Sequence, residues 1–307
     1  MSLLFLFLDG VGLGSDDATV NPFAAAETPF IEQFLGGKLT ASLAERSSKN
    51  FIFNHADARL GFDGLPQSAT GQTALLTGKN GAEIMAGHYG PWPGPTLKNV
   101  LDEGTLFSEV LAEGRKAQLA NVYPPGYFKA LEGRKRRVNV PVYAAQGAGL
   151  ELLDLAAYHA GRGVSVDLTG DYLKQLDASL PDLTPELSGQ RLVREASRAE
   201  FTFFDFWPTD ASGHRGSFAE AVALVEKIDG FLEGVVASLG EITLLLTSDH
   251  GNLEDKTTRS HTTALVPLLA VGSQAEAFTE VSSLLGVAPA VRVALGLRAS
   301  PPAVGAR

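Results

Sequence analysis

The chain has 307 residues, of which 45% are hydrophobic and 20% charged, a composition typical of a folded globular protein and not of a disordered one. Its formal net charge of −10 argues against general affinity for nucleic acid or for anionic membranes. The absence of cysteine excludes disulfides, thiolate metal sites and cysteine nucleophiles.

The first predicted element is a buried strand over Leu3–Leu8. This apolar run is far shorter than the ~20 residues that a membrane span requires. No basic segment precedes it, and Asp9 ends it, so the features of a signal peptide are missing. We therefore expect no membrane contact and a cytoplasmic location.

Further strands are predicted where short apolar runs rich in β-formers recur along the chain. Helices are predicted between them, where apolar residues recur at spacings of three and four. Because strands alternate with helices, we expect an α/β fold with a mostly parallel, doubly wound sheet. The expected strands are Phe51–Phe53, Leu119–Val122, Phe201–Phe206, Ile242–Thr247 and Val266–Val271, and the expected helices are Thr28–Leu35, Thr105–Ala112 and Phe218–Leu239.

A stretch of different composition lies between a Pro-Pro pair at 124–125 and a Pro-Asp pair at 181–182. We predict that residues 126–184 form a small inserted cap and that residues 1–125 and 185–307 form the core domain. The cap begins with five cations within nine residues, among them Arg134 and Arg136. Most charge runs are solvated surface, but these two arginines are also suited to clamping an anionic substrate over the sheet.

Acidic residues and histidines follow three of the predicted strands. A single aspartate after a strand is usually a cap or turn residue, but three of the six histidines of the chain also lie in or soon after these motifs. The carboxyl ends of strands are where α/β sheets bind ligands, and mixed carboxylate and imidazole donors suit Zn²⁺, Mn²⁺ or Fe²⁺ better than Ca²⁺. The candidate metal ligands are Asp9, Asp210, His214, Asp249, His250 and His261.

The segment from Leu65 to Gly78 is predicted to be a loop that runs into a short helix, with Ser68 as its N-cap. A plain capping serine is one interpretation. The other is a nucleophile, because a hydroxyl at a helix N-terminus lies beside free N–H groups that suit a phosphate, and a nearby divalent metal lowers its pKa. Thr70 is the alternative nucleophile. His88, in a Gly-His-Tyr-Gly string, is expected to line the same site.

Three common catalytic signatures are missing. Gly10, Gly12 and Gly14 form G-x-G-x-G instead of the dinucleotide pattern G-x-G-x-x-G, and the preceding carboxylate of Asp9 would repel a pyrophosphate. Neither a P-loop nor a G-x-S-x-G motif occurs. Dinucleotide, nucleotide-hydrolase and serine-hydrolase functions therefore have no support.

Six strings together resemble the alkaline phosphatase superfamily, in particular the metal-dependent domain of cofactor-independent phosphoglycerate mutase. The resemblance covers roughly residues 1–78 and 201–272, and the motifs come in the same order as in the mutase. The strings are Leu-Asp-Gly-Val-Gly, Asn21 with Ala-Glu-Thr-Pro, Gly-Leu-Pro-Gln-Ser, Asp-Ala-Ser-Gly-His-Arg-Gly, Thr-Ser-Asp-His-Gly-Asn and His-Thr-Thr.

The resemblance implies a binuclear centre that holds two divalent ions, Mn²⁺ or Zn²⁺ with Mg²⁺ as an alternative. One site would comprise Asp210, His214 and His261, and the other Asp9, Ser68, Asp249 and His250. Ser68 would attack a phosphorus centre in line and form a phosphoserine. Substrate contacts are expected from Asn21, Thr70, His88, Arg134 and Arg136.

The predicted function is hydrolysis of a small phosphorylated metabolite, that is, a phosphatase. A phosphomutase is the alternative, although residues 68–72 read Ser-Ala-Thr-Gly-Gln where the mutase has Ser-Glu-Val-Gly-His. An inactive scaffold or binding descendant is the third possibility, and it is disfavoured because all seven ligand positions carry competent residues. The sulfatase branch is disfavoured because its signature is missing from this sequence. Phosphodiesterases fit less well because they usually carry threonine as the nucleophile. The sequence makes no prediction of oligomeric state.

Overall fold

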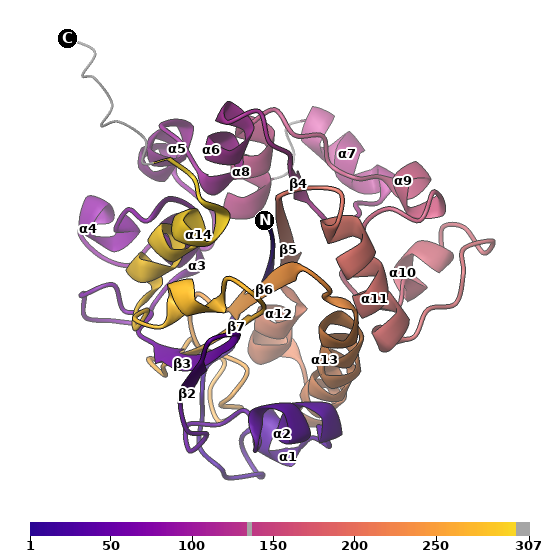
Figure 1. Cartoon of the computed structure of the whole chain (residues 1–307). Coiled ribbons are helices and arrows are strands. Elements are labelled where there is room, and N and C mark those ends of the chain that lie inside the picture. Colours follow the sequence, from indigo (N-terminus) through magenta and orange to yellow (C-terminus); the bar gives the residue numbers. More distant parts are fainter. Residues whose placement is uncertain (134–136, 299–307) are drawn as a thin grey trace.

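A computed structural model describes residues 1–133 and 137–298, and its centre is a seven-stranded sheet in the order β2-β3-β7-β6-β1-β5-β4 (Figure 1). The neighbours β6, β1, β5 and β4 pair in parallel, whereas β7, β3 and β2 join with antiparallel pairings. The strands are β1 (Ser2–Leu8), β2 (Arg46–Ser48), β3 (Phe51–Ala56), β4 (Ala117–Leu119), β5 (Phe201–Phe206), β6 (Ile242–Thr247) and β7 (Val266–Val271).

The α/β class and the parallel centre of the sheet are confirmed. Strand β7 is antiparallel to β6, and the segment between them contains no helix of the kind that usually makes a parallel crossover. The predicted strand Leu119–Val122 ends early, at Leu119, and beyond it Asn121 and Val122 make only isolated bridges.

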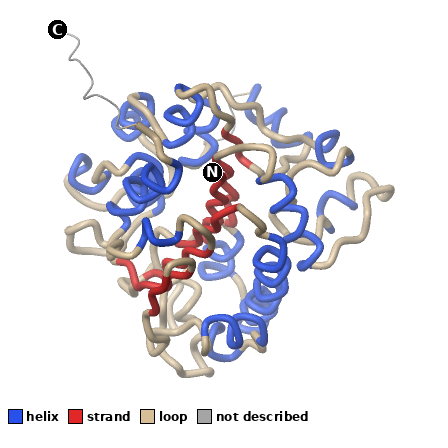
Figure 2. The backbone as a smooth tube through the Cα atoms, viewed as in Figure 1, coloured by secondary structure: helices blue, strands red, loops and turns tan. Residues whose placement is uncertain are grey.

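Helices cover both faces of the sheet (Figure 2). Alternate residues of β1 point to opposite sides, so that Phe5 and Phe7 join one apolar cluster and Leu4 and Leu6 the other. The first cluster includes helices α3 (Ser68–Thr77), α5 (Pro95–Asp102), α6 (Leu106–Ala112), α8 (Val140–Gly147) and α14 (Val287–Leu295), and the second includes α2 (Pro29–Leu35), α11 (Pro185–Ala196) and α13 (Phe218–Ser238).

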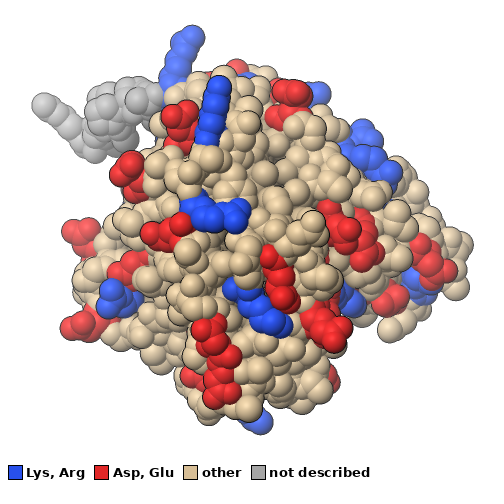
Figure 3. Space-filling view, turned by 60° about the horizontal axis from the view of Figure 1, so that its bottom comes forward, with Lys and Arg blue, Asp and Glu red and all other residues tan. Residues whose placement is uncertain are grey.

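The remaining helices are short, and no helix in the described part of the chain is long and apolar enough to cross a membrane. Acidic and basic side chains are interspersed on the face displayed in Figure 3. The remaining short helices are α1 (Pro22–Ala25), α4 (Gly81–Met85), α7 (Pro125–Glu132), α9 (Leu155–His159), α10 (Asp171–Lys174) and α12 (Pro208–Arg215). Two 3₁₀ turns lie at Ala275–Phe278 and Leu284–Gly286.

The segment expected to form a cap, residues 126–184, carries helices α8, α9 and α10 and most of α7. Helix α8 contributes Val140, Val142 and Ala145 to the cluster that it shares with α3 and α6. Tyr158 and Leu173 instead form a small cluster with Val122. The division into core and cap stays a prediction, and Arg134 and Arg136 lie outside the described residues.

Helix α3 approaches the end of β6 closely at Gly71. A Cβ at this position would lie 2.9 Å from the Cβ of Asp249 and 3.0 Å from its carbonyl oxygen. A glycine is therefore needed for the helix to bring Ser68 up to the carboxyl edge of the sheet.

We predict that Gly71→Ala destabilises the protein by about 1–3 kcal/mol, because the added methyl group overpacks a buried contact. The matched control is Gly126→Ala in α7, where a Cβ meets nothing within 4 Å. We expect Gly126→Ala to raise the free energy of unfolding by up to about 0.5–1 kcal/mol, because alanine stabilises a helix relative to glycine. Urea unfolding of the three proteins checks both values, and equal stabilities of Gly71→Ala and parent would contradict the close contact.

Candidate metal and phosphate site

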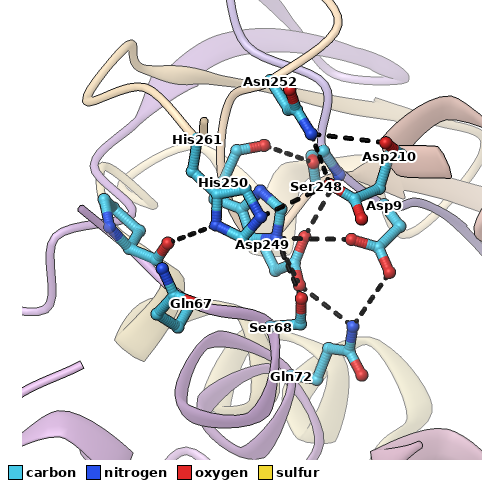
Figure 4. Close-up of polar contacts among 12 residues, drawn as sticks. Asp9, Gln67, Ser68, Gln72, Asp210, Ser248, Asp249, His250, Asn252 and His261 are labelled. Carbon is cyan, nitrogen blue, oxygen red and sulfur yellow. Dashed lines mark hydrogen bonds and ion pairs between the residues drawn. The ribbon is translucent and has the colours of Figure 1, made fainter. Parts of the chain in front are cut away.

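The three acidic motifs meet at the carboxyl edge of the sheet (Figure 4). Asp9 comes directly after β1, and a single residue, Ser248, separates β6 from Asp249. Asp210 lies in the first turn of α12, which begins directly after β5. Because β1 lies between β5 and β6, the three carboxylates converge, as the sequence predicts.

The first group of predicted ligands is in mutual contact and buried. The hydroxyl of Ser68 lies 3.0 Å from Nε2 of His250. The same nitrogen lies 3.4 Å from Oδ1 of Asp9 and 3.6 Å from Oδ2 of Asp249. Residues 9, 68, 249 and 250 therefore form one cluster, although they come from three separate parts of the chain.

The second group lies beside the first. Nε2 of His214 is 3.1 Å from Nε2 of His261, and the two nitrogens are 3.3 Å and 3.5 Å from Oδ1 of Asp210. The rings of His250 and His261 stack with centroids 3.7 Å apart. The two groups thus form one continuous arrangement of carboxylates and imidazoles.

Backbone carbonyls fix the tautomers of the histidines. A carbonyl oxygen only accepts, so Nδ1 of His214 donates to Arg259 at 2.6 Å and Nδ1 of His261 donates to Pro66 at 2.7 Å. Nδ1 of His250 lies 3.3 Å from the carbonyl oxygen of Gly251. In each neutral imidazole the lone pair then lies on Nε2 and faces the carboxylates, which is how metal-ligating histidines are oriented. Burial opposes the charging of His261, but its hydrogen bonds to Asp210 and to the carbonyl of Pro66 raise its pKa.

The donor set fits divalent metal ions. Ligand atoms lie within 4.8 Å of one another in two trios, Asp210–His214–His261 and Asp9–Asp210–His250. Oδ1 of Asp9 is shielded from solvent and has no hydrogen-bond partner among the described residues. Lone pairs and carboxylate oxygens that face one another repel unless a cation lies between them.

The electrostatics favour a cation as well. Burial raises the pKa of Asp249 to about 7, helped by the charge of Asp210 and opposed by a hydrogen bond from Gln72. Burial and the neighbouring Asp249 raise the pKa of Asp9 well above its usual value. Burial lowers the pKa of His250 to about 3, so its imidazole is neutral and cannot offset the carboxylates.

The structure starts α3 one residue earlier than predicted. Gln67 is the N-cap and makes no side-chain cap bond, while Ser68 is the first helical residue. The prediction of Ser68 as N-cap is therefore wrong by one position. As a result the hydroxyl is not used for capping and instead faces His250 (Figure 4).

Two residues predicted to bind substrate have structural tasks. Asn21 caps α1, since its side-chain oxygen accepts from the N–H of Phe23 and its amide donates to the carbonyl of Ser15. Thr70 is fully buried, and its hydroxyl donates to the carbonyl of Gln67 at 2.9 Å. Their roles in substrate binding stay predictions that this geometry does not favour.

Sequence reasoning missed Gln72. Its amide nitrogen donates to Oδ2 of Asp249 at 3.0 Å and to Oδ2 of Asp9 at 3.3 Å, so it holds two prospective ligands of one metal (Figure 4). Its position four residues after Ser68, on the same helix face, was the available signal.

A second orienting set surrounds Asp210. The amide of Asn252 donates to Oδ1 of Asp210 at 2.7 Å. The buried carboxylate of Glu254 in turn accepts from the N–H groups of Asn252 and Gly12, at 2.7 Å and 3.0 Å. Asn252 was visible in the Asp-His-Gly-Asn string, but its partner was not.

Asp205 was also missed, because it lies in the mostly apolar strand β5. It is 2% exposed, and Asn139 donates to one of its oxygens at 2.5 Å. Burial raises the pKa of Asp205 to about 7, and the Asn139 hydrogen bond opposes the rise. Its charge adds to the electrostatic field that acts on Asp9.

We predict that Gln72→Leu weakens Mn²⁺ binding about 10- to 100-fold, because residues that orient metal ligands commonly contribute this much. Gln118→Leu is the matched control, since the amide of Gln118 also donates to two acceptors but is only partly buried and lies in β4. Isothermal titration with Mn²⁺ measures both. Parent-like affinity of Gln72→Leu would show that the amide does not organise the site.

The chain is similar to known proteins in sequence and in fold. Curated relatives include the 2,3-bisphosphoglycerate-independent phosphoglycerate mutases of Mycoplasma pneumoniae, 28% identical over 44% of this chain and 30% of that protein, and of Aliivibrio fischeri, 35% identical over 35% of this chain and 24% of that protein. These matches span less than a third of the length of either relative.

Solved structures with a similar fold include the alkaline phosphatase of the Antarctic bacterium TAB5, with a TM-score of 0.58, 14% identity and coverage of 97% of this chain and 98% of that one. The cold-active alkaline phosphatase of Shewanella sp. gives a TM-score of 0.57 at 14% identity and covers 96% of this chain and 100% of that one. A sequence profile described as Metalloenzyme superfamily matches residues 1–299. The chain therefore belongs to the Metalloenzyme superfamily.

Proposed function

We propose that the chain is a metal-dependent phosphoric-ester hydrolase that acts through a phosphoserine on Ser68. The observation that supports it most is the position of this hydroxyl. Ser68 lies in the first turn of α3, and its hydroxyl is 3.0 Å from Nε2 of His250. The hydroxyl is therefore next to both the carboxylate and imidazole donors and the N-terminus of a helix. That combination suits a phosphate between metal ions and backbone N–H groups.

The donors divide into two prospective metal sites. Asp210, His214 and His261 would hold one divalent ion, and Asp9, Ser68, Asp249 and His250 the other. When bound, such ions offset the charge of the phosphate and lower the pKa of a nearby hydroxyl. Manganese or zinc suits the imidazole nitrogens, and magnesium is the alternative.

The residues of the chain would then carry out two displacements. In the first, Ser68 loses its proton, its Oγ bonds to phosphorus, and the leaving alcohol departs with the electron pair and gains a proton. In the second, the oxygen of a water molecule bonds to the same phosphorus, the bond between phosphorus and Oγ breaks, and Oγ takes up the proton that the water loses. The N–H groups of Ser68 and Ala69, at the start of α3, would be available to the transferred group in both steps, whereas that of Thr70 already donates to the carbonyl of Tyr89.

A phosphomutase is the second candidate, and the identity with two phosphoglycerate mutases favours it. In that case the hydroxyl of a second substrate replaces water in the second displacement. The ratio of free phosphate to transferred phosphate separates the two activities. An inactive scaffold is disfavoured, because all the predicted metal ligands are present and in contact.

We predict that Ser68→Ala lowers phosphatase activity by several orders of magnitude without unfolding the protein, because it removes the nucleophile and leaves six ligands. Acid-quenched parent enzyme should contain phosphoserine at position 68, and the variant should not. Ser47→Ala, on the exposed strand β2, is the control and should behave as parent. Undiminished turnover by Ser68→Ala would exclude Ser68 as the nucleophile.

We predict that Mn²⁺ binding weakens by up to about tenfold for each pH unit below 7. The pKa of Asp249 is raised to about 7, so below this pH the metal has to displace a proton, whereas above it the carboxylate is already ionised. Titrations at pH 6, 7 and 8 measure the slope. An affinity that does not change with pH would place the metal away from Asp249, and full activity in excess chelator would refute metal dependence.

A further inference from the structure

A shallow groove of about 520 Å³ lies beside the N-terminal end of α3. Its lining includes a short segment before the helix and the loop after α4. The residues that matter for its chemistry are Asp63, Leu65, Gln67, His88 and Tyr89. Neither prospective metal site includes any of them.

The groove is fixed next to the nucleophile. Gln67 precedes Ser68 directly, and a Cβ on Gly90 would lie 3.1 Å from the Cβ of Gln67 and 3.3 Å from the nitrogen of Ser68. The N–H of Thr70 donates to the carbonyl of Tyr89 at 3.1 Å, which ties the loop to α3. The groove therefore begins directly beside the residue proposed as the nucleophile.

The lining residues, which form the wall of the groove, do not favour a second anionic group on the substrate. Among the lining residues that the structure describes there is no lysine or arginine, and Asp63 contributes a negative charge. Burial lowers the pKa of His88, with a smaller opposing effect from the Phe62 backbone, so the imidazole is neutral at neutral pH. Its ring nitrogens make no hydrogen bond of normal geometry with described residues.

The wall does offer contacts to an uncharged alcohol. Tyr89 and Leu65 are 39% and 42% exposed and present apolar surface. The amide of Gln67 adds hydrogen-bonding groups, and His88 adds part of its ring surface, although both of its ring nitrogens are shielded from solvent. Hydroxyl groups and an apolar or planar face are the features that such a mixed surface binds.

We propose that this groove binds the leaving alcohol of the substrate and selects phosphomonoesters whose alcohol carries no second negative charge. The inference rests on the proposed hydrolase function and names its substrate class. An arginine clamp from residues 134 and 136, predicted from the sequence, would give the opposite preference.

The test compares two substrates of nearly equal size, glycerol 3-phosphate and 3-phosphoglycerate, which differ by a hydroxymethyl and a carboxylate group. With Mn²⁺-loaded parent, kcat/KM should be at least about tenfold higher for glycerol 3-phosphate. Asp63→Lys should narrow the ratio about three- to tenfold, mainly by lowering KM for 3-phosphoglycerate, because it replaces repulsion with attraction. Glu241→Lys makes the same change of charge before β6, at the opposite edge of the sheet, and should leave the ratio unchanged.

His88→Ala should raise KM for glycerol 3-phosphate several-fold and leave inhibition by inorganic phosphate unchanged, since phosphate alone does not reach the groove. A parent that prefers 3-phosphoglycerate, or equal effects of Asp63→Lys and Glu241→Lys, would overturn the inference. Hydrolysis of p-nitrophenyl phosphate by the same protein keeps these results separate from the proposed function. Failure to hydrolyse that ester at all would overturn the proposed function itself, and the groove assignment with it.

Discussion

The repulsion between buried carboxylates at the end of the central strands is the constraint on which the arrangement depends. Asp9 and Asp249 lie within reach of the same imidazole nitrogen, and burial raises the pKa of both. The neighbouring amides add no charge to the cluster. Gln72 donates a hydrogen bond to Asp249, and Asn252 donates one to Asp210. The fold thus concentrates acidic groups where either protons or a bound cation must balance their charge.

The rigidity of this cluster comes from residues that never touch its centre. Glu254 ties the loop after β1 to the loop after β6, through the N–H groups of Gly12 and Asn252. Ser248 accepts from Val11 at 2.9 Å and bonds back to the carbonyl of His250. These bonds hold two loops that carry ligands in a fixed relation, which limits the reorganisation needed when a charged substrate binds.

The strand ends and the histidines near them were predictable, because short apolar runs mark strands and parallel strands share a carboxyl edge. His261 was a candidate ligand because it follows soon after the Asp-His motif, but only the resemblance assigned it to a particular metal site. It precedes β7, and it reaches the carboxyl edge because that strand is antiparallel. Gln72 and Asp205 were not predicted, because a helix or a mostly apolar strand can contain a polar residue, and the sequence pattern does not indicate which groups that residue contacts. The boundary at Gln67 and Ser68 differs by one residue, as helix ends commonly do.

The sequence separation of the ligands governs when the centre can form. The contact between Gly10 and Asp249 spans 239 residues, and that between Ser68 and His250 spans 182. Contacts of this range close late, after local helices and hairpins, because their loop entropy is lost only once the sheet is assembled. A chain emerging from the ribosome therefore has no centre until β6 has been made, and metal acts on the finished fold, where it adds stability by mass action. Recovery of metal affinity during refolding therefore reports when the loops after β1 and β6 and the start of α3 have come together.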